Sequence, residues 1–379
     1  MKTSQRILIC PLEWGLGHAG RMIPLARKLQ KMNNEIFIGA GQEHLALFRQ
    51  ELPGSVLIEF KGFKPGYSGV FPQYLILLFK IPVLFFHIIT EHFRLKGIIR
   101  EHKIDIVISD NRLGLWRNGM KTVYISHLLR IPFPRKLRWL EPVGIIIHRF
   151  FIRRYSYCYI PDVPGRLNIS GRLSHGLKLH PDTRFIGILS RFSGPVESVR
   201  REAGLPVKLV LLILSGPEPQ RRILKQKVTD IFKDSDMQLT ILEGKPGGNQ
   251  DAIISGNICS YSHLPSSEFR KVLLESDYII SRSGYSTIME LASLNRSALL
   301  IPTPGQTEQE YLAQHLSGMG WFETVSQKHL KKGLILPRIK HLNAESISDE
   351  SSRLLEEALT DLLYQQEKDT HNPKSGKKS

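Results

Sequence analysis

Short apolar runs recur along the chain and alternate with segments in which apolar residues have helical spacing. The first run, Ile7 to Cys10, precedes a glycine-rich loop, a helical segment from Arg21 to Lys31 and a second run from Glu35 to Ile38. This order predicts a βαβ unit. Further buried strands are predicted at residues 56–60, 104–109 and 122–125. Because these runs are apolar throughout, they indicate a parallel sheet covered by helices.

A second series of strands follows a connection rich in proline, glycine and serine, "PDVPGRLNISGRLSHGLKLHPDTRF". It begins near Phe185 and continues through the apolar runs within 207–215, 238–242, 257–261, 278–281 and 298–301. We therefore predict two doubly wound α/β domains, with a first domain over 1–165, a linker over 166–184, a second domain over 185–364 and a disordered tail over 365–379.

Length and composition agree with two domains inside a cell. A chain of 379 residues with 41% hydrophobic content exceeds what one core usually fills. Its three cysteines lie singly without CxxC spacing, which predicts neither a disulfide framework nor a zinc site. The first residues run directly into a strand, so we expect no secretory leader and a cytoplasmic protein.

The net charge of +17 favours an anionic partner. Residues 121–172 hold ten Lys or Arg against two acidic residues, interleaved with apolar blocks. This segment fits an anionic membrane surface, a nucleic acid or a plain solvated face. The apolar stretch from Tyr74 to Ile89 is broken by Lys80 and Pro82, and is shorter than the ~20 residues of a spanning helix. We expect it to form a buried helix, or a peripheral membrane contact through Phe85 and Phe86.

Two loops follow predicted strands in the second half. In "SGPEPQR", Ser215 and Gly216 allow backbone amides to approach an anion, although a tight turn with surface arginines fits equally. In "SRSGYSTIMEL", a glycine turn opens into a helix whose start fits a diphosphate, with Glu290 accepting hydrogen bonds from a ribose. Thr287 and Glu290 also have the spacing of a capping box, which needs no ligand.

The segment "SRSGYSTIMELASLNRSALLIPTPGQTEQEYLA" resembles the donor signature of GT-B glycosyltransferases of family 28, and "EWGLGHAGRMIPLARKL" is similar to the family's glycine-rich loop. The resemblance covers both halves. It implies two Rossmann-like domains facing each other across a cleft, with a UDP-sugar in the second domain and the acceptor in the first. It also implies inversion at the anomeric carbon, no metal, and no cofactor beyond the UDP-sugar substrate.

Carried over by motif, the resemblance assigns residues to the donor. They are Glu290 for the ribose; Ser215, Gly216, Ser286 and Thr287 for the diphosphate; Ser283 and Gly284 for the turn; Arg282 for the phosphates; His263 for the uracil; and Gln309 and Glu310 for the sugar. Two departures bear on the sugar: the phosphate loop is SGPEPQR instead of a glycine-rich GSQGA type, and Glu310 replaces a glutamine.

Catalysis requires a base for the acceptor hydroxyl. His18, at the tip of the first glycine loop, titrates near neutral pH and is the preferred base. Asp110, at a strand end, is expected to orient His18 or to act as the base itself, and Glu13 is a weaker candidate. The residues expected on the acceptor side are Gly15, Gly17, Asn111, Arg112 and His127.

We therefore predict an inverting, metal-independent glycosyltransferase. It is expected to move N-acetylglucosamine from its UDP derivative to a lipid-linked or cell-envelope glycan at the inner face of the plasma membrane. The expected partners are this donor, this acceptor and an anionic membrane, but no nucleic acid. Two alternatives remain open: a UDP-sugar hydrolase or epimerase of related fold, and a non-catalytic basic protein that binds membrane or nucleic acid.

Overall fold

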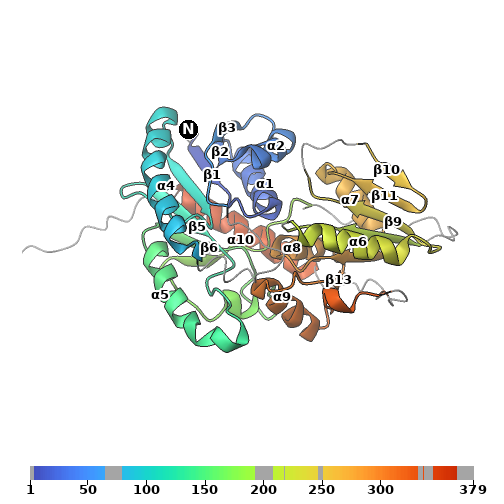
Figure 1. Cartoon of the computed structure of the whole chain (residues 1–379). Coiled ribbons are helices and arrows are strands. Elements are labelled where there is room, and N and C mark those ends of the chain that lie inside the picture. The colour runs from blue at the N-terminus through green and yellow to red at the C-terminus, as the bar shows by residue number, and fades with distance from the viewer. Residues whose placement is uncertain are drawn as a thin grey trace, which may run out of the picture.

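The computed structural model describes residues 4–64, 79–192, 208–216, 218–245, 251–331, 336 and 345–364. Two sheets, each of seven described strands, lie side by side with helices packed against them (Figure 1). The expected tail over 365–379 and residues 74–78 of the apolar stretch lie outside the described residues.

The first sheet has the order β3-β2-β1-β4-β5-β6-β7 and its strands pair in parallel. Its central strands are buried along almost their whole length, as the uninterrupted apolar runs predict. The elements of this domain are β1 (Arg6–Cys10), α1 (Leu16–Lys31), β2 (Glu35–Ala40), α2 (Gln42–Glu51), β3 (Val56–Glu59), α4 (Ile81–His102), β4 (Ile106–Asp110), β5 (Lys121–Ile125), α5 (Glu141–Ile152), β6 (Tyr157–Ile160) and β7 (Thr183–Phe185).

The second sheet has the order β10-β11-β9-β8-β12-β13-β14, and only the edge pair β10–β11 is antiparallel among the described pairings. Its elements are β8 (Leu209–Ile213), α6 (Gln220–Phe232), β9 (Gln238–Leu242), β10 (Ile253–Ser255), β11 (Ile258–Tyr261), α7 (Ser266–Glu275), β12 (Tyr278–Ser281), α8 (Tyr285–Ser293), β13 (Leu299–Leu300), α9 (Thr307–Gly318), β14 (Glu323–Thr324) and α10 (Glu345–Tyr364).

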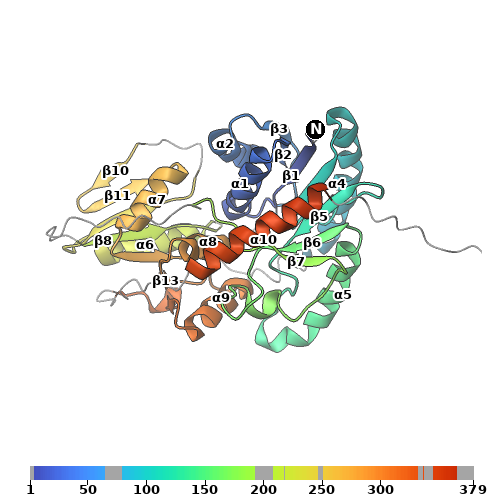
Figure 2. The same ribbon diagram turned by 180° about the vertical axis from the view of Figure 1, so that it is seen from behind.

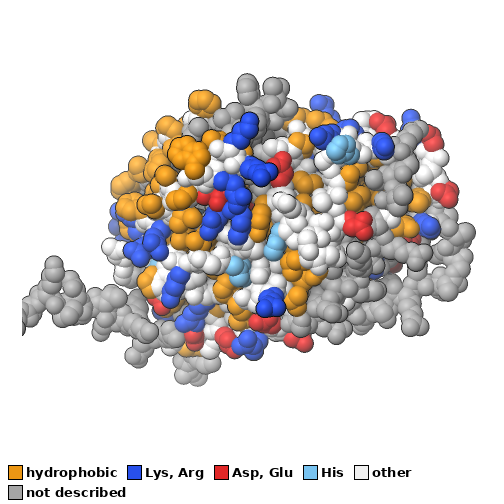
Figure 3. All heavy atoms as spheres, turned by 90° about the horizontal axis from the view of Figure 1, so that it is seen from below, with side chains coloured by type: hydrophobic (Ala, Val, Ile, Leu, Met, Phe, Trp, Pro, Cys, Tyr) orange, Lys and Arg blue, Asp and Glu red, His pale blue; other side chains and the backbone are white. Residues whose placement is uncertain are grey.

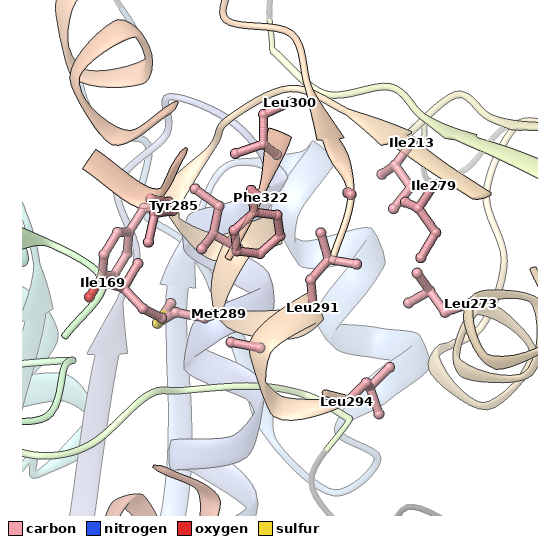
Figure 4. Close-up of a cluster of buried hydrophobic side chains, with 14 of the residues drawn as sticks. Ile169, Ile213, Leu273, Ile279, Tyr285, Met289, Leu291, Leu294, Leu300 and Phe322 are labelled. Atoms are coloured by element: carbon pink, nitrogen blue, oxygen red, sulfur yellow. The ribbon is translucent and has the colours of Figure 1, made fainter. Parts of the chain in front are cut away.

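Helix α8 is held firmly in the second domain. Its apolar residues Met289 and Leu291 are fully buried in one cluster with Leu300 of β13 and Phe322 (Figure 4). Such a dense core leaves the backbone little freedom to move. The N-terminus of α8 is therefore presented at a fixed position.

Each sheet has a switch point at which the chain changes its direction of travel across the strands. In the first sheet this point lies between β1 and β4, and in the second between β8 and β12. Ligands of open α/β sheets bind beyond the carboxyl ends of the strands at such points. The loops after these four strands carry most of the predicted site residues, whereas His127, His263, Gln309 and Glu310 follow the strands β5, β11 and β13.

The chain changes domain later than the proline-rich segment suggested. Strand β7 pairs with β6, so residues through Phe185 belong to the first sheet instead of a linker. Ile186 and Leu189 then pack in the core of the first domain, whereas Ile188 and Phe192 pack in that of the second. The proline-, glycine- and serine-rich composition suggested a linker, but the segment is ordered. Buried Asp162 accepts hydrogen bonds from the backbone N–H groups of Val163, Ile169 and Ser170.

Helix α10 crosses back between the domains. Figure 2 shows it running across the rear of the molecule from α8 toward β5 and β6. Ile347 near its start packs in the second core, but Leu359 and Leu362 pack in the first. The predicted second domain over 185–364 therefore contains residues that pack with the first domain: Phe185, Ile186 and Leu189, and the later turns of α10.

Two elements differ from the sequence-based expectation. Helix α1 begins at Leu16 instead of Arg21, because Gly15 with φ of 144° turns the chain directly into a helix. The basic, apolar segment within 121–172 is not one continuous surface. Its residues 157–160 form β6, in which Cys158 and Tyr159 are buried.

Candidate functional site

The two switch points face a cavity of about 430 Å³ between the domains. The first domain contributes Gly15, Gly17, His18 and His127, and the second contributes Ser215, Gly216, His263, Gly284, Ser286, Thr287, Glu290 and Gln309. These twelve predicted site residues lie on opposite walls of one cavity. Its other walls include Trp14, Arg21, Arg191, Tyr285 and Glu308.

Two helix N-termini open into this cavity. Helix α8 begins after Gly284 and α1 begins after Gly15, and neither end has a side-chain capping hydrogen bond. Thr287 lies inside α8 and is not its N-cap, so the alternative of a capping box between Thr287 and Glu290 is wrong. Free N–H groups and the helix dipole at such an end attract anions. The arrangement suits a diphosphate group.

The loop after β8 forms the floor beside the start of α8. Gly216 has φ of 87°, which favours glycine, and a Cβ there would lie 4.0 Å from the Thr303 hydroxyl. A Cβ on Gly284 would lie 3.9 Å from Ser215 Oγ and 4.0 Å from the Thr287 hydroxyl. Thr303 Oγ1 is buried and has no hydrogen-bond partner among the described residues. Small residues and hydroxyls thus surround the space that an anion would fill.

Glu290 lines the cavity one turn into α8 and is 7% exposed. Its Oε1 accepts a hydrogen bond of 2.7 Å from Nε of Arg191, and the guanidinium group of Arg191 lies 5.1 Å from the rings of Phe192 and Phe269. The carboxylate faces the cavity, as a ribose contact requires. Arg191 lies in the segment that joins the domains.

His18 and Asp110 form a close pair on the opposite wall. His18 lies in the first turn of α1, with Nδ1 2.9 Å from Asp110 Oδ2. Burial and the nearby Arg21 lower the pKa of His18, although Asp110 opposes this. Burial alone would raise the pKa of Asp110, but Arg21 and His18 lower it to about 2. The pair therefore combines a neutral imidazole with an ionised carboxylate at neutral pH.

His127 connects the two walls. Its Nε2 lies 2.8 Å from Oε1 of Glu308 at the start of α9, and its ring stacks on Tyr285 with centroids 3.8 Å apart. Its Nδ1 lies 3.0 Å from NH1 of Arg21. The side chain of His127 is 3% exposed, so these contacts surround it almost completely.

Six predicted site residues do not line the cavity: Asp110, which lies behind His18, and five others. Arg282 is fully buried and donates to the Ile301, Pro302 and Gln220 carbonyls and to Gln327 Oε1. It holds loops together and does not line the cavity. Ser283 Oγ donates to the Gln309 carbonyl, and exposed Glu310 accepts from the Gly305 N–H. Neither residue lines the cavity.

On the acceptor side, Asn111 accepts a hydrogen bond from the Tyr124 hydroxyl, and Arg112 is buried against Glu91 and Phe60. Both side chains turn away because β4 ends at Asp110, and the residues after it lead back into the core. Glu13 lines the cavity, but its Oε1 accepts the Gly41 N–H, which gives it a structural role.

The sequence-based argument gave no individual role to Arg21, Tyr285 or Glu308, all of which line the cavity. Arg21 follows His18 by three positions, so a helix beginning at Leu16 places both on one face. The predicted start at Arg21 concealed that relation. Glu308 stands beside Gln309 in a polar loop, and the sequence does not tell which of the neighbouring side chains faces the cavity.

Comparison with known proteins bears on the family. Residues 211–371 match the model of the glycosyltransferase family 28 C-terminal domain. The chain is 34% identical over 261 residues to a UDP-N-acetylglucosamine–N-acetylmuramyl-(pentapeptide) pyrophosphoryl-undecaprenol N-acetylglucosamine transferase of Buchnera aphidicola subsp. Schizaphis graminum, a match that covers 55% of this chain and 71% of that protein. The chain belongs to glycosyltransferase family 28.

A protein of Desulforamulus reducens with the same name is 29% identical over 177 residues, which are 41% of this chain and 47% of that protein. Among solved structures, the glycotransferase of kitacinnamycin superposes with a TM-score of 0.61 at 15% identity over 95% of this chain and 96% of its own. Spinosyn rhamnosyltransferase SpnG, complexed with thymidine diphosphate, gives 0.56 at 15% identity over 94% and 92%. These structural similarities confirm the predicted GT-B fold. Membership of family 28 confirms the prediction that the chain is a glycosyltransferase.

Proposed function

We propose that this glycosyltransferase moves N-acetylglucosamine from its UDP derivative to a hydroxyl group of a lipid-linked or cell-envelope glycan, with inversion and without a metal. The carrying observation is the cavity itself. An uncapped helix end beside Glu290 lies on its second-domain wall, and His18 paired with Asp110 lies on the first-domain wall. The relatives named for N-acetylglucosamine transfer support the choice of donor and acceptor.

In this proposal the donor lies on the second-domain wall. The diphosphate sits at the N-terminus of α8 against Ser215, Gly216, Ser286 and Thr287, and Glu290 accepts hydrogen bonds from the ribose hydroxyls. The amides and dipole of α8 stabilise the charge that develops on the leaving diphosphate. Gln309 faces the sugar. His263, whose Nε2 is buried without a partner among the described residues, lies toward the uracil.

The acceptor hydroxyl approaches from the opposite wall. With Nδ1–H donated to Asp110, Nε2 of His18 carries a free electron pair and takes the proton as the hydroxyl oxygen attacks the anomeric carbon. The bond to the diphosphate breaks on the side away from the attacking oxygen. A single displacement with nucleophile and leaving group on opposite walls inverts the anomeric configuration.

A membrane contact fits a lipid-linked acceptor. Large apolar side chains of α4 and α5 stand exposed, including Phe86 at 67%, Phe93 at 62%, Ile146 at 67% and Phe150 at 57%. Figure 3 shows hydrophobic side chains gathered together with Lys and Arg over one side of the molecule. No helix among the described residues is long and apolar enough to span a bilayer. We therefore infer peripheral binding to an anionic bilayer at the inner face of the plasma membrane.

Calorimetric titration with UDP and UDP-N-acetylglucosamine tests the donor site. Replacing Glu290 by Gln removes a charged acceptor from the ribose, which should weaken UDP binding by about 10- to 100-fold, since hydrogen bonds to charged groups contribute about 1.5–3 kcal/mol. The exposed pair partner Glu357→Gln serves as a control. Unchanged UDP affinity in the Glu290 variant would refute the assignment, and release of free sugar without any acceptor would point to a hydrolase.

A further inference from the structure

A continuous chain of polar side chains crosses the cleft from one domain to the other. It runs from Asp110 and His18 through Arg21 to His127, and from His127 to Glu308 of the second domain. Apart from Glu308, which is 24% exposed, and His18, which is 19% exposed, these side chains are at most 3% exposed. Buried polar chains of this kind are rigid only when each member has its partner.

Arg21 is the branching point of this chain. Its Nε lies 3.1 Å from Asp110 Oδ2 and its NH2 contacts Asp110 Oδ1, which makes a two-pronged contact with the carboxylate. Its NH1 lies 3.0 Å from Nδ1 of His127, and its NH2 lies 2.9 Å from Nδ1 of His18. A guanidinium group only donates hydrogen bonds. Nδ1 of His127 therefore accepts, and its Nε2–H donates to Glu308.

At His18 two neighbours compete for one nitrogen atom. If Nδ1–H donates to Asp110, Nε2 has a free electron pair and serves as a base. If Nδ1 instead accepts a hydrogen bond from NH2 of Arg21, the proton of the neutral ring lies on Nε2, and the ring cannot take a proton there. The position of the Arg21 guanidinium group thus decides which tautomer His18 adopts.

The second domain holds His127 from two sides. Glu308 accepts its Nε2–H, and the Tyr285 ring stacks on it at an interplanar angle of 7°. The Tyr285 hydroxyl in turn donates to the Pro161 carbonyl of the first domain over 2.8 Å. Separation of the domains would remove both contacts from His127, and Arg21 would lose a fixed acceptor for NH1.

We propose that Arg21 is a positioning residue that makes His18 competent as a base only when Glu308 and Tyr285 of the donor domain hold His127. With His127 in place, the guanidinium group stays on Asp110 and leaves Nδ1–H of His18 to the carboxylate. The inference rests on the proposed role of His18 and adds a control by domain closure. Premature deprotonation of the acceptor, before the donor domain has closed, is thereby avoided.

The electrostatics of the chain agree with this role. The groups that face His18 are Asp110 from β4, Arg21 from α1, His127 after β5 and Glu308 from α9. Arg21 is the largest influence after burial that lowers the pKa of His18. Removal of this positive charge, with Asp110 left beside the ring, should raise the pKa of His18.

The test is the pH profile of kcat with saturating UDP-N-acetylglucosamine in the full-length Arg21→Met, Arg21→Lys and Glu308→Gln variants. Arg21→Met should lower kcat about 10-fold or more, because Asp110 loses the two-pronged contact that holds its carboxylate against His18. It should also move the acidic limb to higher pH, because the imidazole then protonates more readily. Arg21→Lys keeps the positive charge but lacks the planar guanidinium group that contacts both carboxylate oxygens. The acidic limb should therefore return to its parental pH, while kcat should stay below the parental value. The exposed Arg49→Met substitution should change neither.

Glu308→Gln tests the connection across the cleft without disturbing the first domain. We expect kcat to fall about 5-fold or more while UDP affinity stays within twofold, and ¹⁵N spectra of histidine should report a higher share of the His18 tautomer protonated at Nε2. If Arg21→Met fails to fold, Glu308→Gln carries the test alone. The inference is wrong if the variants bind UDP but keep the parental pH limb and the parental His18 tautomer. If His18→Ala is inactive in the same series, the proposed base still stands. Full activity of His18→Ala would instead refute the proposed base.

Discussion

Three buried arginines and the partly buried Arg191 differ in function because of what each guanidinium group contacts. Arg21 meets a carboxylate and two imidazoles at the cavity, and Arg191 meets the carboxylate of Glu290. Arg282 meets carbonyl oxygens and one amide, and Arg112 meets Glu91 and two carbonyls in the core. Burial without a carboxylate lowers the pKa of Arg282 to about 10, but the side chain stays protonated at neutral pH. An arginine beside a glycine turn is therefore weak support for a phosphate contact.

At the residue scale, the pH dependence of the enzyme tests His18. A base must be neutral to act, so kcat/KM should fall as the pH drops through the pKa of His18. Burial and Arg21 hold that pKa below its ordinary value, so the acidic limb should lie below about pH 6.5. Asp110, with a pKa of about 2, stays ionised throughout this range.

Replacing His18 by Ala should lower kcat by about 10²- to 10⁴-fold and remove this limb, with UDP affinity retained. Steady-state rates from pH 5 to 8 give the measurement. A limb that persists in the alanine variant would belong to another group.

At the element scale, the contact between α10 and the crossover segment holds the two domains together. Gly187 has φ of 72°, and a Cβ there would lie 2.2 Å from Cα of Ser351 in α10. Ser351 Oγ accepts the N–H of Ile188 over 3.0 Å in the same contact. The helix backbone therefore approaches the chain so closely that only a glycine fits.

Gly187→Ala should push α10 away and destabilise the protein well beyond the local strain. Gly176→Ala is the matched control, because Gly176 has φ of 74° with nothing within 4 Å of the position of a Cβ. Both variants pay about 1–2 kcal/mol for a left-handed backbone, so the difference between them reports the clash alone. Thermal unfolding and proteolysis within residues 345–364 give the measurements, and equal midpoints would contradict the argument.

At the scale of the whole molecule, the exposed apolar faces of α4 and α5 form one surface. The rings of Phe85 in α4 and Phe151 in α5 lie 5.9 Å apart, and Arg154 stacks on Phe150 at 3.7 Å. Exposed Arg135, Lys136, Arg138, Arg149 and Arg153 lie in and around α5. Apolar side chains bordered by cations favour a bilayer with anionic head groups.

Vesicle co-sedimentation tests this surface. The double variant Phe86→Asp, Phe150→Asp should bind anionic vesicles about 10-fold or more weakly. It removes apolar area that the bilayer would bury, and it adds negative charges that the anionic head groups repel. Ile254→Asp provides the control, since Ile254 is 72% exposed on β10 of the other domain. Binding of the parent should weaken with added salt. Equal binding by both variants would contradict a membrane role for α4 and α5.

The sequence by itself determined the α/β class, most of the strands and several of the loops that line the cavity. Buried parallel strands require uninterrupted apolar runs, and anion-binding loops at strand ends favour glycine and hydroxyl residues, so both leave local signals. The residues Gly284, Ser286, Thr287 and Glu290 were found in this way, as was His18.

Only the tertiary structure decided which neighbouring side chain faces the cavity and where the chain changes domain. Arg282 and Glu310 stand within two positions of cavity residues in the sequence, and Arg112 stands two positions after Asp110, but none of the three lines the cavity. The directions of the Arg282 and Arg112 side chains depend on partners that are distant in the chain. Arg21, His127 and Glu308 come from three separate segments, and their contact exists only when both domains fold and meet. Local patterns specify elements, whereas the packing of one domain on the other specifies this polar chain.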